Sequence, residues 1–79
     1  MDKTLKQQKI ELWHKKLSDY EKQLEETMQR RGEAAREGDL RENAAYQMAS
    51  EDADMLRAQI ENVKKILRDL GADPDKEDK

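Results

Sequence analysis

Apolar side chains recur at alternating steps of three and four in two separate stretches of this chain, and this spacing most restricts its fold. The first series is Ile10, Trp13, Leu17, Tyr20 and Leu24, continued by Thr27 or Met28 and then the polar Arg31. The second series is Ala45, Ala49, Ala53 (or Asp52), Leu56, Ile60, Val63, Leu67 and Leu70. Such steps line up along one stripe of an α-helix, as in a coiled coil. We call this stripe the seam and predict two helices packed along it.

The ends of the first helix are predicted from a capping residue and a glycine. Thr4 is expected to act as N-cap, because its hydroxyl can accept a hydrogen bond from a free backbone N–H of the first turn. The helix is expected to continue through Gly32 and to end near Arg36 or Glu37. Gly38 is predicted to be the C′ residue, because glycine takes the left-handed conformation without penalty.

The second helix also has capping signals at both ends. Asp39 and Glu42 have nearly the spacing of a capping box, so we expect Asp39 to be the N-cap and the helix to begin at about Leu40. Gly71 is expected to end that helix just after Leu70. A capping box therefore explains this pair of carboxylates without any functional role.

These signals predict an all-α fold, a long antiparallel two-helix coiled-coil hairpin over residues 4–72 with its tip at about 37–43. Residues 73–79 are charged, and we expect a disordered tail. The opposite end of the rod, the base, carries the larger apolar side chains: Trp13, Leu17, Ile60, Ile66 and Leu67. A lone hairpin of this size is marginally stable. Two hairpins pairing through the base, or docking on a larger protein, would bury this surface.

Composition excludes several classes of function. Charged residues make up 44% of the chain against 34% hydrophobic, and the net charge is −3. This charge argues against direct DNA binding, which needs a basic surface. No apolar run approaches the roughly 20 residues that span a bilayer, and the start of the chain lacks the apolar stretch of a signal peptide. We therefore expect a soluble cytoplasmic protein with no membrane contact. Cysteine is absent, which excludes disulfides and cysteine-based zinc sites.

The segment between the two series reads Ala35-Arg36-Glu37-Gly38-Asp39-Leu40-Arg41-Glu42-Asn43-Ala44-Ala45-Tyr46. It resembles the tip signature of the bacterial GreA and GreB transcript-cleavage factors, in which Ala-Arg precedes Gly-Asp-Leu-x-Glu-Asn-x-Glu-Tyr. The positions that match in order are Gly38, Asp39, Leu40, Glu42, Asn43 and Tyr46. The resemblance covers roughly residues 4–72 and the N-terminal coiled-coil domain of that family, without its C-terminal domain.

The resemblance implies a function in transcription elongation. Such factors insert their hairpin into the secondary channel of bacterial RNA polymerase, where two tip acids help to hold an Mg²⁺ ion and an attacking water. Here the two acids would be Asp39 and Glu42. The protein would hold no cofactor on its own and would be no enzyme, but would stimulate RNA cleavage by the polymerase. Carboxylate oxygens are the ligands that Mg²⁺ prefers.

The resemblance also suggests roles for the residues around the two acids. It implies tip support or partner contact, including contact with the 3′ end of the nascent RNA, for Arg36, Gly38, Leu40, Arg41, Asn43 and Tyr46. Two positions depart from the family pattern: Ala45 replaces a glutamate, and Ser50 stands where a basic residue is common. Arg30 and Arg31 are further candidates to supply the positive charge.

Two other functions remain open at this level. Without the C-terminal domain, the hairpin could compete with full-length Gre factors for the polymerase. It could instead be a non-catalytic coiled-coil interaction protein that forms a homodimer. We favour a natural short protein over an excised domain, because the chain has a methionine start and a charged tail.

Overall fold

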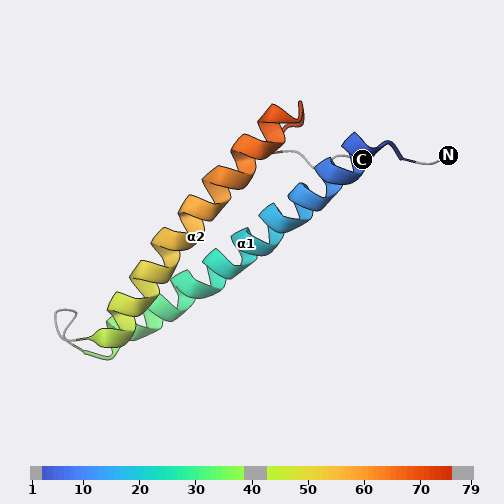
Figure 1. The fold of residues 1–79 in the computed structure, drawn as a ribbon. Coiled ribbons are helices and arrows are strands. Elements are labelled where there is room, and N and C mark those ends of the chain that lie inside the picture. Colours follow the sequence, from blue (N-terminus) through green and yellow to red (C-terminus); the bar gives the residue numbers. More distant parts are fainter. Residues whose placement is uncertain (1–2, 39–42, 76–79) are drawn as a thin grey trace.

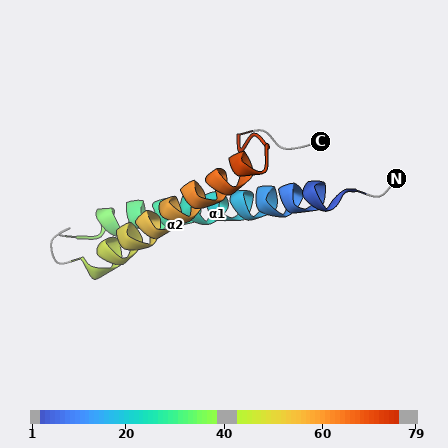
Figure 2. The same ribbon diagram turned by 45° about the horizontal axis from the view of Figure 1, so that its top comes forward.

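The computed structural model describes residues 3–38 and 43–75 and arranges them as an antiparallel helical hairpin (Figure 1). Helix α1 spans Leu5–Arg36 and helix α2 spans Ala44–Asp69. Together they form a rod with extents of 56 × 19 × 15 Å. The two helices pack against each other, and in the view of Figure 2 α2 crosses in front of α1 at the middle of the rod. No strand occurs in the described ranges. The predicted all-α hairpin is confirmed.

The seam is buried as predicted, with large side chains at the base and small ones towards the tip. The apolar cluster at the base consists of Ile10, Leu17, Ile60, Val63 and Leu67. In the half of the rod nearer the tip the buried residues are Thr27, Ala34, Ala49 and Ala53. Burial of apolar surface is the main term that stabilises a helix pair. Hence the base supplies most of this term, and the tip half contributes little.

Three details of the predicted seam are resolved by the structure. Thr27, rather than Met28, continues the first series, because Thr27 is buried and Met28 is only partly buried. Ala53, rather than Asp52, lies in the second series, since Asp52 is exposed. The prediction that Ala45 belongs to the seam is wrong, because its side chain is exposed.

The first helix begins as expected from its capping signals. The Gln7 backbone N–H donates to Thr4 Oγ1 at 3.1 Å, and the Thr4 backbone N–H donates to Gln7 Oε1 at 3.0 Å. This is a full capping box, which satisfies two N–H groups that the helix itself cannot. The helix then continues through Gly32, where a Cβ atom would meet no atom within 4 Å.

The two helices end in different ways. At the end of α2, the Gly71 N–H donates to the Arg68 carbonyl and the Ala72 N–H to the Leu67 carbonyl, each at 2.9 Å. Gly71 has φ +83°, and this pair of bonds is a Schellman motif. Gly38 follows the α1 C-cap Glu37, but its φ is not positive. The prediction that Gly38 adopts the left-handed conformation is therefore wrong, because α1 ends in a turn in which the Glu37 N–H donates to the Ala34 carbonyl at 3.2 Å.

The predicted start of α2 is also wrong. The helix begins at Ala44 instead of about Leu40, and its N-cap is Asn43 instead of Asp39. The Tyr46 backbone N–H donates to Asn43 Oδ1 at 3.1 Å, which is the bond expected of an N-cap. Asp39 and Glu42 themselves lie outside the described residues.

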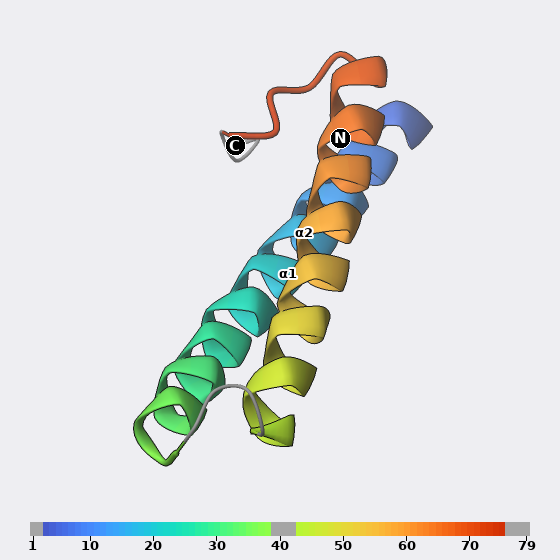
Figure 3. The same cartoon turned by 90° about the vertical axis from the view of Figure 1, so that its left-hand side faces the viewer.

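After α2 the chain turns back towards the helix (Figure 3). The Asp75 carboxylate lies 3.9 Å from Lys64 Nζ, and the Asp75 N–H donates to Asp73 Oδ1 at 2.9 Å. Residues 76–79 of the predicted tail lie outside the described residues. Neither helix in the described part of the chain has an uncharged apolar stretch long enough to cross a bilayer.

Candidate functional site

The candidate site is the tip, where the chain passes from α1 to α2. Of the predicted site residues, the structure describes Arg36, Gly38, Asn43 and Tyr46. Asp39, Leu40, Arg41 and Glu42 lie outside the described residues. Gly38 and Asn43 are the described residues on either side of them.

The Asn43 side chain joins the end of α1 to the start of α2. Its amide Nδ2 donates to the backbone carbonyl of Ala34 in the last turn of α1. Its Oδ1 accepts the N–H of Tyr46 in the first turn of α2. One side chain thus caps α2 and binds a carbonyl at the C-terminal end of α1, where the last carbonyls lack partners within the helix. Asn43 therefore holds together the two ends of the segment that contains both acids.

Arg31 makes a second connection between the helices, farther from the tip than the contact of Asn43. Its Nη2 donates to Tyr46 Oη at 2.7 Å and its Nε donates to Ser50 Oγ at 3.0 Å. The guanidinium carbon lies 4.9 Å from the centre of the Tyr46 ring, a distance at which cation–π attraction also acts. All three residues are half-buried, so these charge-assisted bonds are partly shielded from water. We call Arg31, Tyr46 and Ser50 the cross-helix brace.

The brace changes the interpretation of the nearby arginines. Arg31 and Arg30 were both candidates for a basic surface, but Arg31 is directed into the brace. Arg30 Nη2 donates to the buried Thr27 Oγ1 at 3.0 Å, which gives this polar seam residue a partner. Arg36 lies in the last turn of α1 and is exposed. Among the described arginines it is the one nearest to the tip in sequence.

The sequence interpretation missed the brace. Arg31 was placed on the seam only as a weak position, and Ser50 was noted only as a departure from the family pattern. A signal was nevertheless present: a long cation at a seam position needs polar partners on the facing helix, because a buried charge without them is costly. What the sequence lacked was the register that sets Arg31 opposite Tyr46 and Ser50.

The described residues hold no metal centre of their own. Among residues 3–38 and 43–75, no group of three or more His, Asp or Glu side chains is placed to hold a metal ion. The carboxylates of Asp39 and Glu42, which the resemblance implies as ligands of a hard cation, lie outside the described residues. Two carboxylates cannot fill the six or more positions that such ions require, so any shared ion needs ligands from a partner.

Comparison with known proteins gives a family match. A family model for the GreA/GreB N-terminal region, described as "Transcription elongation factor, N-terminal", matches residues 3–70. Neither the curated proteins nor the solved structures give a significant match. The family match includes both helices and the tip.

Proposed function

Since this chain belongs to the family of GreA/GreB transcription elongation factor N-terminal domains, we propose that it acts on RNA polymerase by inserting its hairpin into the secondary channel. The family implies an interaction with RNA polymerase during transcription elongation. In this proposal the tip reaches the active centre and the protein modulates elongation or transcript cleavage. Its place of action is then the cytoplasm of a bacterium.

The observation that carries the proposal is the way Asn43 closes the end of the rod. The Asn43 side chain joins α1, of 32 residues, to α2, of 26 residues. This connection lies where the segment that contains Asp39 and Glu42 leaves α1 and enters α2. At 1.5 Å per residue, α1 alone holds this segment about 48 Å from its own first turn. A rigid rod with acids at its end suits delivery of carboxylates into a deep, narrow site.

The chemistry of the two acids fits a shared Mg²⁺ ion. When bound, such an ion lowers the pKa of water and stabilises developing charge on a phosphate oxygen. Asp39 and Glu42 would supply part of its ligand set, and the polymerase the rest. The chain itself supplies the length of the rod, the closure of the tip by Asn43, and one exposed cation, Arg36, at the end of α1. Arg36 and Arg41 are the residues we propose to contact the 3′ end of the nascent RNA.

RNA cleavage in purified, backtracked RNA polymerase complexes tests the proposal. The wild-type protein is compared with Asp39→Ala/Glu42→Ala, and with a control pair of exposed acids halfway along α1, Glu21→Ala/Glu25→Ala. We expect the wild type and the control to stimulate cleavage and the tip variant to lose the stimulation. Circular dichroism confirms that all three proteins are equally helical.

Two other outcomes are informative. If the wild type binds the polymerase and blocks a full-length Gre factor without stimulating cleavage, the protein is a competitor whose tip occupies the channel. If it neither binds the core polymerase nor changes cleavage, the proposed function is wrong.

A further inference from the structure

The Asn43 cap and the cross-helix brace meet at one residue, Tyr46. The Tyr46 backbone N–H donates to Asn43 Oδ1 at 3.1 Å, and the Tyr46 hydroxyl accepts a hydrogen bond from Arg31 Nη2 at 2.7 Å. Asn43 in turn donates to the carbonyl of Ala34, which lies three residues after Arg31 on α1. These three bonds close a ring between the last turns of α1 and the start of α2. Both the backbone and a side chain of the first turn of α2 are thus tied to α1.

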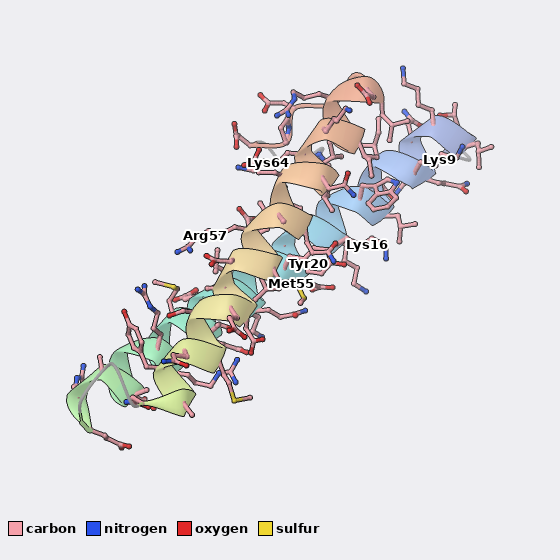
Figure 4. All side chains as sticks on the ribbon, turned by 60° about the vertical axis from the view of Figure 1, so that its left-hand side comes forward. Lys9, Lys16, Tyr20, Met55, Arg57 and Lys64 are labelled. Carbon is pink, nitrogen blue, oxygen red and sulfur yellow. The ribbon has the colours of Figure 1, made fainter. Side chains whose placement is uncertain are left out.

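The Arg31 side chain is turned inward, unlike other long cations of the two helices. Lys9 and Arg57 are exposed on the outside of the rod (Figure 4). Arg31 is half-buried, and its guanidinium donates to both Tyr46 and Ser50 on the facing helix. A guanidinium is planar and its N–H groups point in fixed directions. Two such bonds to one helix therefore restrict both the distance and the rotation of α2 relative to α1.

Apolar packing near the tip is too thin to fix this geometry by itself. The buried residues in the half of the rod nearer the tip are Thr27, Ala34, Ala49 and Ala53. Two packed helices keep a unique register when long side chains of one helix fill the spaces between the side chains of the other. Alanine and threonine side chains are too short to provide much of this contact. We therefore expect the ring of polar bonds to determine where α2 begins relative to α1.

We propose that the cross-helix brace is a positioning device for stimulated transcript cleavage, with Arg31 as its central residue. By fixing the start of α2 against α1, the brace sets how accurately the tip delivers Asp39 and Glu42. This inference rests on the proposed function. Glu42 directly precedes Asn43 in the chain, so a shift of the first turn of α2 moves the point from which the tip is held. Reacting groups that are misplaced by about 1 Å can lose roughly a hundredfold in rate, so residues that touch neither RNA nor metal ion still affect catalysis.

Position 31 allows positioning to be separated from stability. It lies on the seam, where a leucine would bury apolar surface in place of the polar bonds. Tyr46 and Ser50 are half-buried, so their hydroxyls can bond to water when Arg31 is removed. Replacing a partly buried polar network by an apolar side chain is often neutral or stabilising. Arg31→Leu is therefore expected to fold as stably as the wild type while losing the directional bonds that define the geometry.

The geometry is measured on the full chain without polymerase. The chain has no cysteine, so Gln29→Cys and Glu51→Cys place one spin label on each helix at exposed positions close to the brace. Pulsed electron spin resonance gives the distribution of distances between the two labels. We expect a narrow distribution in the otherwise unchanged protein and a broader one when Arg31→Leu is added.

The effect on the reaction is measured by RNA cleavage in purified, backtracked RNA polymerase complexes, over a range of protein and Mg²⁺ concentrations. For Arg31→Leu we expect the cleavage rate at saturating protein to fall about tenfold, while the half-saturating protein concentration stays within about twofold of the wild type. The Mg²⁺ concentration for half-maximal cleavage should rise, because the tip acids are part of the ligand set. Tyr46→Phe removes one bond of the brace and should lower the saturating rate by about threefold.

Two controls separate positioning from other effects. Arg57→Leu is the same substitution at an exposed position of α2 outside the brace, and it should leave the saturating rate, the Mg²⁺ dependence and the label distances unchanged. Ile60→Val removes a methyl group from the apolar cluster at the base and lowers stability. At a temperature where circular dichroism shows every variant to be folded, Ile60→Val should cleave at the rate of the wild type.

The inference is wrong if Arg31→Leu stimulates cleavage as fast as the wild type, or if its label distances stay as narrow. It is also wrong if the loss disappears at saturating protein, since the brace would then affect binding, or if Ile60→Val loses as much activity. A wild type that stimulates no cleavage overturns the proposed function and this inference with it. The wild type alone shows that failure, whereas a failure of the inference alone shows only in the brace variants and their controls.

Discussion

Arg31 Nη2 donates to Tyr46 Oη at 2.7 Å, and this bond ties α1 to α2 less than two turns before α1 ends at Arg36. The bond is charge-assisted and half-buried, whereas the apolar contacts in this half of the rod come mainly from alanines. Where apolar burial is small, polar contacts account for more of the stability. The cross-helix brace and Asn43 should therefore determine how firmly the tip is held.

Removing the Tyr46 hydroxyl tests the brace. Tyr46→Phe keeps the ring against the guanidinium but leaves Arg31 without its shorter hydrogen bond. We expect unfolding free energy to fall by about 1–2 kcal/mol, as for bonds to charged groups. Tyr20→Phe is the matched control, because Tyr20 is also half-buried on the seam. Urea unfolding followed by circular dichroism measures the unfolding free energy of both variants. An equal loss in Tyr46→Phe and Tyr20→Phe would show that the hydrogen bond from Arg31 to Tyr46 does not stabilise the hairpin.

Substituting Asn43 separates its two bonds. Asn43→Ala loses both the cap of α2 and the bond to the Ala34 carbonyl, and we expect a loss of about 2 kcal/mol. Asn43→Asp keeps the cap acceptor but loses the donor, so its loss should be smaller. Asn62→Ala, at an exposed position within α2, should be neutral or slightly stabilising because alanine favours helix. If Asn43→Ala were as stable as the wild type, Asn43 would not hold the tip.

Two glycines should respond to alanine with opposite signs. Gly32 lies within α1 and has open space around its Cβ position, so Gly32→Ala should stabilise the hairpin by about 0.5–1 kcal/mol. Gly71 has φ +83°, which an L-residue adopts only with strain, so Gly71→Ala should destabilise by about 1 kcal/mol. A shift of Tm in the same direction for both variants would contradict the assigned conformations.

His14 offers another site for stabilisation. Its Nε2 atom is buried without a hydrogen-bond partner, and an unsatisfied buried polar atom costs roughly 1–3 kcal/mol. Replacing the ring by an apolar side chain, His14→Leu, should raise Tm. Lys15→Leu, at the exposed neighbouring position, controls for the general effect of leucine and should change Tm less. A lower Tm for His14→Leu would mean that Nε2 has a partner in solution.

The sequence was sufficient to predict the hairpin, because the periodic seam and the caps at Thr4 and Gly71 are local signals. The start of α2 was not predictable in this way. Asp39 and Asn43 are equally good N-caps by residue type, and the bond from Asn43 to the Ala34 carbonyl is a contact between helices that no local pattern contains.

The error at Ala45 has a related cause. A seam that runs through Ala45 and Ala49 advances only by fours, whereas the observed seam runs Tyr46, Ala49, Ala53 in steps of three and four. Tyr46 is long enough to meet Arg31 across the helix pair, and this contact selects the register. The role of Arg31 depends on that register, so it too could not be read from the sequence alone.

The position of the tip in a complex with RNA polymerase is the most direct test of how this protein acts. In core polymerase whose active-site Mg²⁺ is replaced by Fe²⁺, hydroxyl radicals cut protein backbone close to the metal. We predict cutting of the bound hairpin between Gly38 and Asn43, with none at the base near Leu5 or Leu70. Cutting at the base, or a bound hairpin that is not cut at the tip, would contradict delivery of Asp39 and Glu42 to the active centre.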